Sequence, residues 1–233
     1  DEAERVVAEF ESSAALSTRT HADETANDNA PEAPANDAQE ATSIWSAPLR
    51  KRTLALCTVW FCINLSYYGA FIWIPSLLSA QGFSLVKSFA FTLIMTLAQL
   101  PGYAVAAYLI EKWGRRATLA VFLAGSAGAA VCYGLSHSDF YIILSGCFLS
   151  FFNLGAWGAL YAISPEVSPT RLRGTGTGTA AGLGRIASIL APLIVPPLIS
   201  FGGTGVLFAV FAAAFLIAAI TTFALPEKRG KSL

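Results

Sequence analysis

The chain has 233 residues, of which 55% are hydrophobic and only 13% are charged, and its mean hydropathy is +0.56. Because a soluble globular domain carries about 25% charged residues, this composition excludes an ordinary soluble protein and favours a membrane protein. The formal net charge is zero, and no nucleic-acid partner is expected.

The first part of the chain differs in composition from the rest. Residues 1–40 contain eleven acidic residues but only two bases, Arg5 and Arg19, and they are rich in Ala, Asn and Pro. Such a segment has too little apolar surface to offset the entropy lost on ordering. We therefore predict that residues 1–49 form an acidic, mostly disordered linker on the cytoplasmic side.

One short helix is a further expectation near the N-terminus. Val6, Val7 and Phe10 recur at helical spacing, which favours an amphipathic helix over residues 2–12. The chain begins with Asp1 and shows no charged and then apolar leader, so we expect it to be a piece of a longer protein.

From residue 53 onward the chain consists of apolar stretches long enough to cross a bilayer, for which about 20 helical residues suffice. We place six spans, at 53–79, 87–110, 117–135, 140–163, 174–201 and 205–225. A β-barrel would instead show alternating segments of about 10 residues. The sequence therefore predicts an all-α, polytopic membrane protein with a six-helix bundle over 50–226 and a cytoplasmic tail over 227–233.

Basic residues predict the orientation of this bundle, because short cytoplasmic loops retain Lys and Arg. The bases on one side are Arg50, Lys51, Arg52, Lys112, Arg115, Arg116, Arg171, Arg173, Lys228, Arg229 and Lys231. The opposite side has Lys87 alone. We expect both ends of the chain to be cytoplasmic, in a plasma or inner membrane.

The residue types that hold metals or act as nucleophiles are sparse. The cysteines and histidines are Cys57, Cys62, Cys132, Cys147, His21 and His137. The cysteines lie inside spans without the two-residue spacing of a metal site, and no span contains a histidine to act as a base. We expect no metal site, no cofactor and no enzymatic activity.

The fifth span contains a glycine repeat and one charge. Gly174, Gly178 and Gly182 share one helical face, which permits close helix contact, either as static packing or as a sliding surface. Arg185 lies about a third of the way into the span, where an unpaired cation costs roughly 2.5 to 3.5 kcal/mol at the midplane. We expect Arg185 to form a breakable ion pair that closes the cytoplasmic side, with Glu166 in the neighbouring turn or Glu111 across the same surface as the candidate acids. The alternative is a side chain that only extends to the interface.

Polar and aromatic residues on two interrupted spans suggest a cavity. They are Asn64, Tyr67, Tyr68 and Phe71 in the first span and Asn153, Trp157 and Tyr161 in the fourth, with Gln99 in the second. Each one alone is more typical of helix–helix contact. Together they favour a shared interior that binds a small, planar or amphiphilic organic solute.

Two loop motifs resemble those of the major facilitator superfamily. Residues 111–116, Glu-Lys-Trp-Gly-Arg-Arg, are similar to the loop between the eighth and ninth helices of that family. Residues 164–174, Ser-Pro-Glu-Val-Ser-Pro-Thr-Arg-Leu-Arg-Gly, resemble the loop after helix ten in its sugar-porter and metabolite-symporter branches. Residues 67–75 and 99–103 most resemble the subgroup of niacin and aromatic-acid transporters and synaptic vesicle protein 2 relatives.

This resemblance implies a function and a division of roles. The bundle would be the C-terminal half of a twelve-helix carrier that moves a small organic solute by alternating access, with the N-terminal six-helix half missing. The implied cavity residues are Asn64, Tyr67, Tyr68, Gln99, Asn153, Trp157 and Tyr161. The implied cytoplasmic gate residues are Glu111, Gly114, Arg115, Arg116, Glu166, Arg171, Arg173 and Arg185.

Two further points follow from the resemblance. Family relatives often couple transport to protons, yet no carboxylate lies deep in any span, so a titrating group is expected in the missing half. A membrane binding protein of the same fold that does not transport is the alternative function, as in the vesicle-protein branch.

Overall fold

A computed structural model describes residues 43–227 of the protein. The predicted helix over 2–12, nearly all of the predicted acidic linker, and the basic residues of the tail lie outside the described residues. The first described helix begins at Ala47, which falls inside the segment predicted as linker.

Within residues 43–227 the chain forms helices and no strands. The elements are α2 (Ala47–Phe71), α3 (Ile74–Ala80), α4 (Leu85–Leu97), α5 (Gln99–Trp113), α6 (Arg115–Leu135), α7 (Asp139–Ile163), the 3₁₀ helices η1 (Ser164–Glu166) and η2 (Thr170–Leu172), and α8 (Arg173–Thr222). Five helical stretches are long and apolar enough to cross a membrane: 47–71, 85–113, 115–135, 139–166 and 170–222. The predicted all-α, polytopic fold is confirmed.

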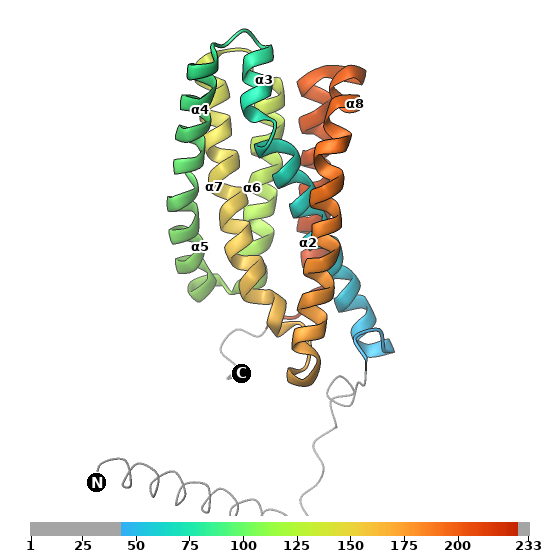
Figure 1. Ribbon diagram of the computed structural model, residues 1–233. Coiled ribbons are helices and arrows are strands. Elements are labelled where there is room, and N and C mark those ends of the chain that lie inside the picture. Colours follow the sequence, from blue (N-terminus) through green and yellow to red (C-terminus); the bar gives the residue numbers. More distant parts are fainter. Residues whose placement is uncertain (1–42, 228–233) are drawn as a thin grey trace, which may run out of the picture. The chain divides into compact units, whose positions relative to one another are not determined.

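The last of these stretches is bent into two arms. A straight α8 of 50 residues would extend about 75 Å, more than twice the hydrocarbon thickness of about 30 Å. Gly202 and Gly203 have non-helical backbone angles, and φ of Gly203 is +68°, a conformation that favours glycine. The chain therefore reverses at this pair, and Figure 1 shows the first arm in orange and the returning arm in red.

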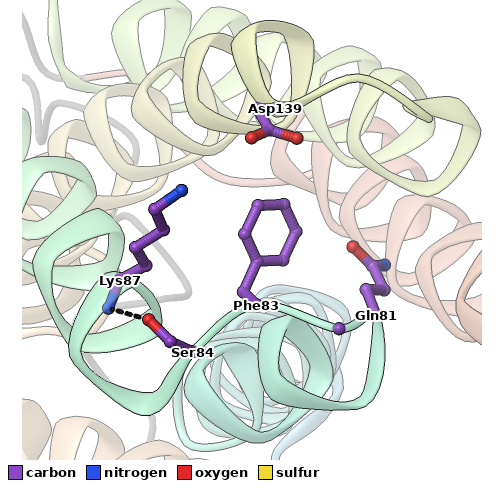
Figure 2. Close-up of a pocket in the computed structure, with 6 residues that line it drawn as sticks. Gln81, Phe83, Ser84, Lys87 and Asp139 are labelled. Carbon is purple, nitrogen blue, oxygen red and sulfur yellow. Dashed lines mark hydrogen bonds between the residues drawn. The ribbon is translucent and has the colours of Figure 1, made fainter.

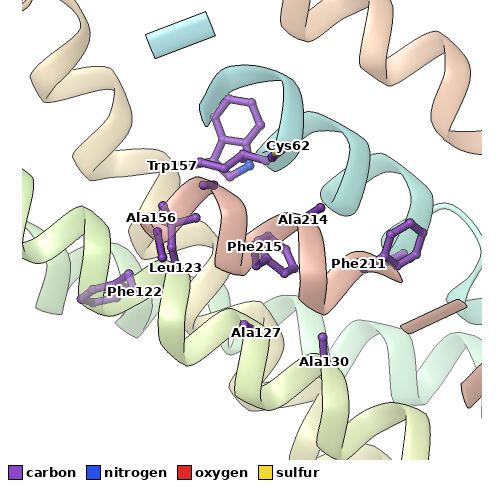
Figure 3. Packing of buried hydrophobic residues seen from close by; sticks show 14 of the residues in the cluster. Cys62, Phe122, Leu123, Ala127, Ala130, Ala156, Trp157, Phe211, Ala214 and Phe215 are labelled. Carbon is purple, nitrogen blue, oxygen red and sulfur yellow. The ribbon is translucent and has the colours of Figure 1, made fainter. Parts of the chain in front are cut away.

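The returning arm of α8 supplies the centre of the bundle. α8 packs against both α2 and α6, and α6 also packs against α7. Phe208, Phe211 and Phe215 are fully buried, and Figure 3 shows the last two between α2 and α6. The Phe211 ring occupies the space beside Gly69, where a side chain would collide with it. A glycine in α2 thus lets an aromatic residue of α8 fill the core.

The three glycines of the α8 repeat make no close contact with another helix within the described chain. A Cβ placed on Gly174, Gly178 or Gly182 would meet no described atom within 4 Å. The close contact with α2 instead occurs at Gly184, where a Cβ would lie 2.6 Å from Asn64 Nδ2. Within the described chain these three glycines therefore contact no neighbouring helix, because α8 turns a different face towards α2. Static packing and a sliding surface both stay open as predictions for contact with another bundle.

The connections separate into two ends of the bundle. Figure 1 shows the start of α2, the α5–α6 turn and the connection from α7 to α8 at one end, with the α3–α4 loop and the bend of α8 at the other. The first end contains Arg115, Arg116, Arg171 and Arg173. The second contains Lys87 as its one described Lys or Arg. The loops thus divide the cations unequally between the two ends.

Candidate functional site

Side chains of α2 and α7 form an aromatic cluster. We define this cluster by its six rings, Trp60, Tyr67, Tyr68, Phe71, Trp157 and Tyr161. The Trp157 ring lies 5.6 Å from Trp60, 5.9 Å from Tyr67 and 5.5 Å from Tyr161, measured between centroids. These spacings are those of favourable edge-to-face and offset aromatic pairs. The cluster therefore forms a wall of aromatic rings across two helices.

The cluster contains predicted residues and one that the sequence reasoning missed. Tyr67, Tyr68, Trp157 and Tyr161 are among the predicted cavity residues, whereas Trp60 was not predicted. Its ring lies 5.3 Å from that of Tyr161, and its indole Nε1 donates to Ser164 Oγ at 2.9 Å. The signal was present, because Trp60 precedes Asn64 by one helical turn and so continues the same stripe.

The side chain of Asn64 lies at the contact between α2 and α8. Its Nδ2 donates to the Trp60 carbonyl at 2.7 Å, and its Oδ1 accepts from Ser188 Oγ at 2.9 Å. The residue is buried. Asn64 thus joins the two helices directly behind the aromatic cluster.

Two predicted cavity residues of α7 carry buried polar atoms without a hydrogen-bond partner in the described chain. Asn153 is 1% exposed, and neither its amide nitrogen nor its amide oxygen has a hydrogen-bond partner within the described chain. The indole Nε1 of Trp157, one turn further along α7, is likewise buried without a partner. An unsatisfied buried polar group costs about 1 to 3 kcal/mol. A solute or a water that supplied hydrogen bonds here would recover that cost.

Gln99 is the first residue of α5 and lies beside the aromatic cluster. Its side chain is adjacent to the Tyr67 phenol and is buried. Tyr103, one turn later, packs its ring 3.2 Å from the position that a Cβ on Gly158 would take. α5 therefore adds an amide and a phenol beside the aromatic cluster.

Arg185 contacts the aromatic cluster. Its Nη1 donates to the Tyr68 hydroxyl at 3.2 Å, and its side chain is exposed. Within residues 43–227 Arg185 forms an ion pair with neither Glu166 nor Glu111, and Glu166 is paired with Arg115 instead. The guanidinium of Arg185 is therefore directed towards the aromatic cluster and not towards the loops.

The polar turn between α5 and α6 is held together by two carboxylates. Arg115 Nε lies 3.3 Å from the buried Glu166 Oε1, which joins the turn to η1. Glu227 Oε2 accepts from the Arg116 backbone N–H at 3.1 Å, so this carboxylate lies at the start of α6, where an anion is favourable. A Cβ on Gly114, whose φ is +92°, would meet the Glu227 carboxylate within 2.9 Å.

Glu227 was not predicted as part of this turn. It follows the last span, and only the returning arm of α8 brings it to α6. Of the other predicted gate residues, Glu111, Arg171 and Arg173 form no ion pair within residues 43–227. Of the predicted gate residues, the structure thus brings together Gly114, Arg115, Arg116 and Glu166 at the polar turn. The others, which lie outside this group, are Glu111, Arg171, Arg173 and Arg185.

Replacement of Glu166 by Gln should lower the thermal stability of the purified protein. The change removes the charge that faces Arg115 and leaves a partly buried guanidinium unpaired, at a cost of about 1 to 3 kcal/mol after allowance for solvent at Arg115. The measurement is the unfolding temperature in detergent. The matched control is Glu111→Gln, because Glu111 is exposed and unpaired in the described chain. Equal unfolding temperatures for the two variants would contradict the role of Glu166.

Comparison with known proteins identifies the family. The profile of the "Sugar (and other) transporter" family matches residues 1–233. The putative niacin/nicotinamide transporter NiaP of Bacillus subtilis is 48% identical over 184 residues, which cover 77% of this chain and 45% of the relative. The niacin transporter NiaP of Acinetobacter baylyi is 46% identical over 192 residues, which cover 82% of this chain and 44% of that relative.

A more distant relative belongs to the vesicle-protein branch. The synaptic vesicle 2-related protein of Bos taurus is 26% identical over 222 residues, which cover 84% of this chain and 40% of that protein. The chain spans less than half the length of each of these three relatives. Together with the apolar helices, these matches confirm the resemblance drawn from the two loop motifs. The chain therefore belongs to the sugar (and other) transporter family of the major facilitator superfamily, whose members are multi-pass membrane transporters and not enzymes.

Proposed function

We propose that this chain is the C-terminal six-helix half of a twelve-helix carrier for a small organic solute. The share of the relatives that it spans, 45% and 44% for the two niacin transporters, supports this proposal. The two arms of α8 and the joined pairs α2–α3 and α4–α5 provide six helical passes with α6 and α7. The partner of this half is the N-terminal six-helix bundle, and both lie in a lipid bilayer.

The aromatic cluster is the observation that carries this proposal. It offers several aromatic faces, and next to it lie the unpartnered amide of Asn153 and the cation of Arg185. Aromatic faces stack on planar rings, while an amide and a guanidinium orient polar substituents. This combination favours a small, planar solute with a polar or anionic group. Niacin, named for two relatives, fits that description.

Alternating access is the proposed mechanism. The two bundles would rock about the solute, and the polar turn with Arg115, Glu166 and Glu227 would close the cytoplasmic side in one state. The three open glycines of α8, at 174, 178 and 182, offer a surface on which the other bundle slides. Binding energy that differs between the states drives the exchange.

Proton coupling, if present, requires a titrating group from the other half. The acidic residues of the described chain are Glu111, Asp139, Glu166 and Glu227, and all lie at helix ends or connections. None occupies the middle of a helix that crosses the membrane. A carboxylate that takes up the coupling proton would thus belong to the N-terminal bundle.

The proposed orientation places both ends of this segment in the cytoplasm of a plasma or inner membrane. The support is the cluster of cations at the end of the bundle that contains Arg115 and Arg116. Labelling of a cysteine placed at Trp113 by an impermeant reagent should require permeabilised cells. Labelling in intact cells would contradict this orientation.

Replacement of Trp157 by Ala should raise the apparent KM for niacin uptake more than replacement of Trp113 by Ala. Trp157 stacks on Tyr161 within the aromatic cluster, whereas Trp113 is 50% exposed at the end of α5. Losing one stacking contact costs about 0.5 to 1.5 kcal/mol, which predicts an increase in the apparent KM of about twofold to tenfold. The measurement is the initial rate of uptake by vesicles that contain the full-length protein.

Equal effects of the two tryptophan variants would count against the aromatic cluster as the solute site. The alternative function, a membrane binding protein that does not transport, predicts niacin binding without uptake in the same vesicles. The likeness to a synaptic vesicle 2-related protein favours keeping this second candidate.

A further inference from the structure

A cavity opens at the end of the bundle opposite the polar turn. It has a volume of about 470 Å³ and is lined by Gln81, Gly82, Phe83, Ser84, Lys87 and Asp139. We call it the α3–α4 pocket. A second cavity of about 400 Å³ shares Gln81, Phe83 and Asp139 with it and continues towards His137 and Thr204. Volumes of about 300 to 1,000 Å³ are typical of pockets that hold small molecules.

The pocket presents one cation and one anion. Figure 2 shows the Lys87 ammonium and the Asp139 carboxylate directed into the space around the Phe83 ring, from α4 and α7 respectively. Within residues 43–227 these two groups form no ion pair with each other or with another residue. Opposite charges thus face one cavity without neutralising each other.

Helix stability explains the anion but not the cation. Asp139 is the first residue of α7, where a carboxylate is favourable with the helix dipole. Lys87 is the third residue of α4, and its backbone N–H donates to the cap residue Ser84; a cation is unfavourable in this first turn. The helix dipole therefore does not account for the position of Lys87 beside the pocket.

We propose that the α3–α4 pocket binds a small zwitterion. Its anionic group contacts Lys87, its cationic group contacts Asp139, and its planar or apolar middle lies against Phe83. A singly charged molecule of the same size can contact only one of these two exposed charges. This proposal goes beyond the transported solute, because it concerns a separate site away from the aromatic cluster.

The test measures protection at the pocket in the full-length protein. Gln81 lines the pocket and is exposed, so a Gln81→Cys variant reports occupancy through its rate of maleimide labelling, read by mass spectrometry on the peptide that contains residue 81. The probe is N-methylnicotinate, which carries both charges. Nicotinate and 1-methylnicotinamide, which carry one negative and one positive charge respectively on the same pyridine framework, are the comparison ligands.

N-methylnicotinate should slow labelling at concentrations about fivefold lower than either comparison ligand, the factor expected for one partly exposed charge contact. Adding Lys87→Met or Asp139→Asn should remove this preference. Lys112→Met, which removes a cation from the other end of the bundle, should retain it. Trp157→Ala should also retain it, which separates this pocket from the proposed transport site. Equal protection by all three ligands, or a preference that survives both charge-removing variants, would overturn the proposal.

The same chemistry occurs in zwitterionic phospholipid head groups, so a second arm identifies the source. Labelling is repeated in vesicles of phosphatidylglycerol and of phosphatidylcholine. Slower labelling in phosphatidylcholine, abolished by Lys87→Met, would identify a head group as the occupant. Protection by dissolved N-methylnicotinate that is equal in both vesicles would identify a free solute. If neither the head group nor the dissolved ligand slows labelling, the pocket does not bind a zwitterion.

Discussion

Replacement of Arg185 by Leu is expected to abolish or strongly reduce solute uptake while membrane insertion is preserved. Arg185 is the one charged residue between Gly174 and Thr222, and its guanidinium donates to Tyr68 in the aromatic cluster. The side chain is exposed, so the fold does not depend on it. Removing a cation from a span also makes insertion easier. The loss should therefore appear in the initial rate of uptake and not in the amount of protein in the membrane.

Two companion variants sharpen this experiment. Arg185→Lys keeps the charge without the planar donor group and should retain part of the activity. Tyr68→Phe removes the hydroxyl that receives the guanidinium and should lower uptake less than Arg185→Leu does. Unchanged initial rates for Arg185→Leu would remove Arg185 from both the solute site and the gate.

Replacement of Gly102 by Ala is expected to prevent normal packing of α5 against α7. A Cβ at this position would lie 3.0 Å from the carbonyl carbon of Phe151 and closer still to its oxygen. Both atoms belong to the backbone, so no side-chain rotation can relieve the overlap. Forced overpacking costs about 1 to 3 kcal/mol, and more when the backbone must shift. The expected result is a lower unfolding temperature and a lower yield of monodisperse protein.

Gly128→Ala is the matched control for this variant. Gly128 lies within α6, and a Cβ there would meet no described atom within 4 Å. Alanine also favours a helix over glycine by about 0.8 to 1 kcal/mol, so this variant should be as stable as the parent or slightly more stable. A Gly102→Ala protein as stable as Gly128→Ala would show that α5 and α7 are less closely packed than described.

The helix content and the breaks in the helices were accessible from the sequence because they follow from local signals. The interval between the predicted fifth and sixth spans coincides with Gly202 and Gly203, where the backbone leaves the helix. The break between α2 and α3 lies just before Pro75, which cannot donate to the helical hydrogen-bond ladder. Such features depend on residues that are close in the chain, and their physical causes can be read one segment at a time.

The polar contacts were less predictable because they depend on how distant helices pack. Glu166 was expected to face Arg185, but the packing of η1 against α8 and α7 brings it to Arg115 instead. The aromatic stripe of α2 was visible at Tyr67 and Tyr68, yet the role of Trp60 depends on Tyr161 and Ser164, about 100 residues later. The proposed solute site thus rests on residue types that the sequence indicated and on neighbours that only the fold provides.

The position of Glu227 has a consequence for how this protein is tagged. Its carboxylate accepts from the Arg116 backbone N–H in the first turn of α6, and the Leu225 carbonyl accepts from Arg116 Nη1 at 3.4 Å. A fluorescent reporter or affinity handle joined directly after Leu225 would delete that anchor and loosen a turn that is distant in sequence. Fusions should therefore keep residue 227 and add a spacer, so that trafficking and expression assays report the native molecule.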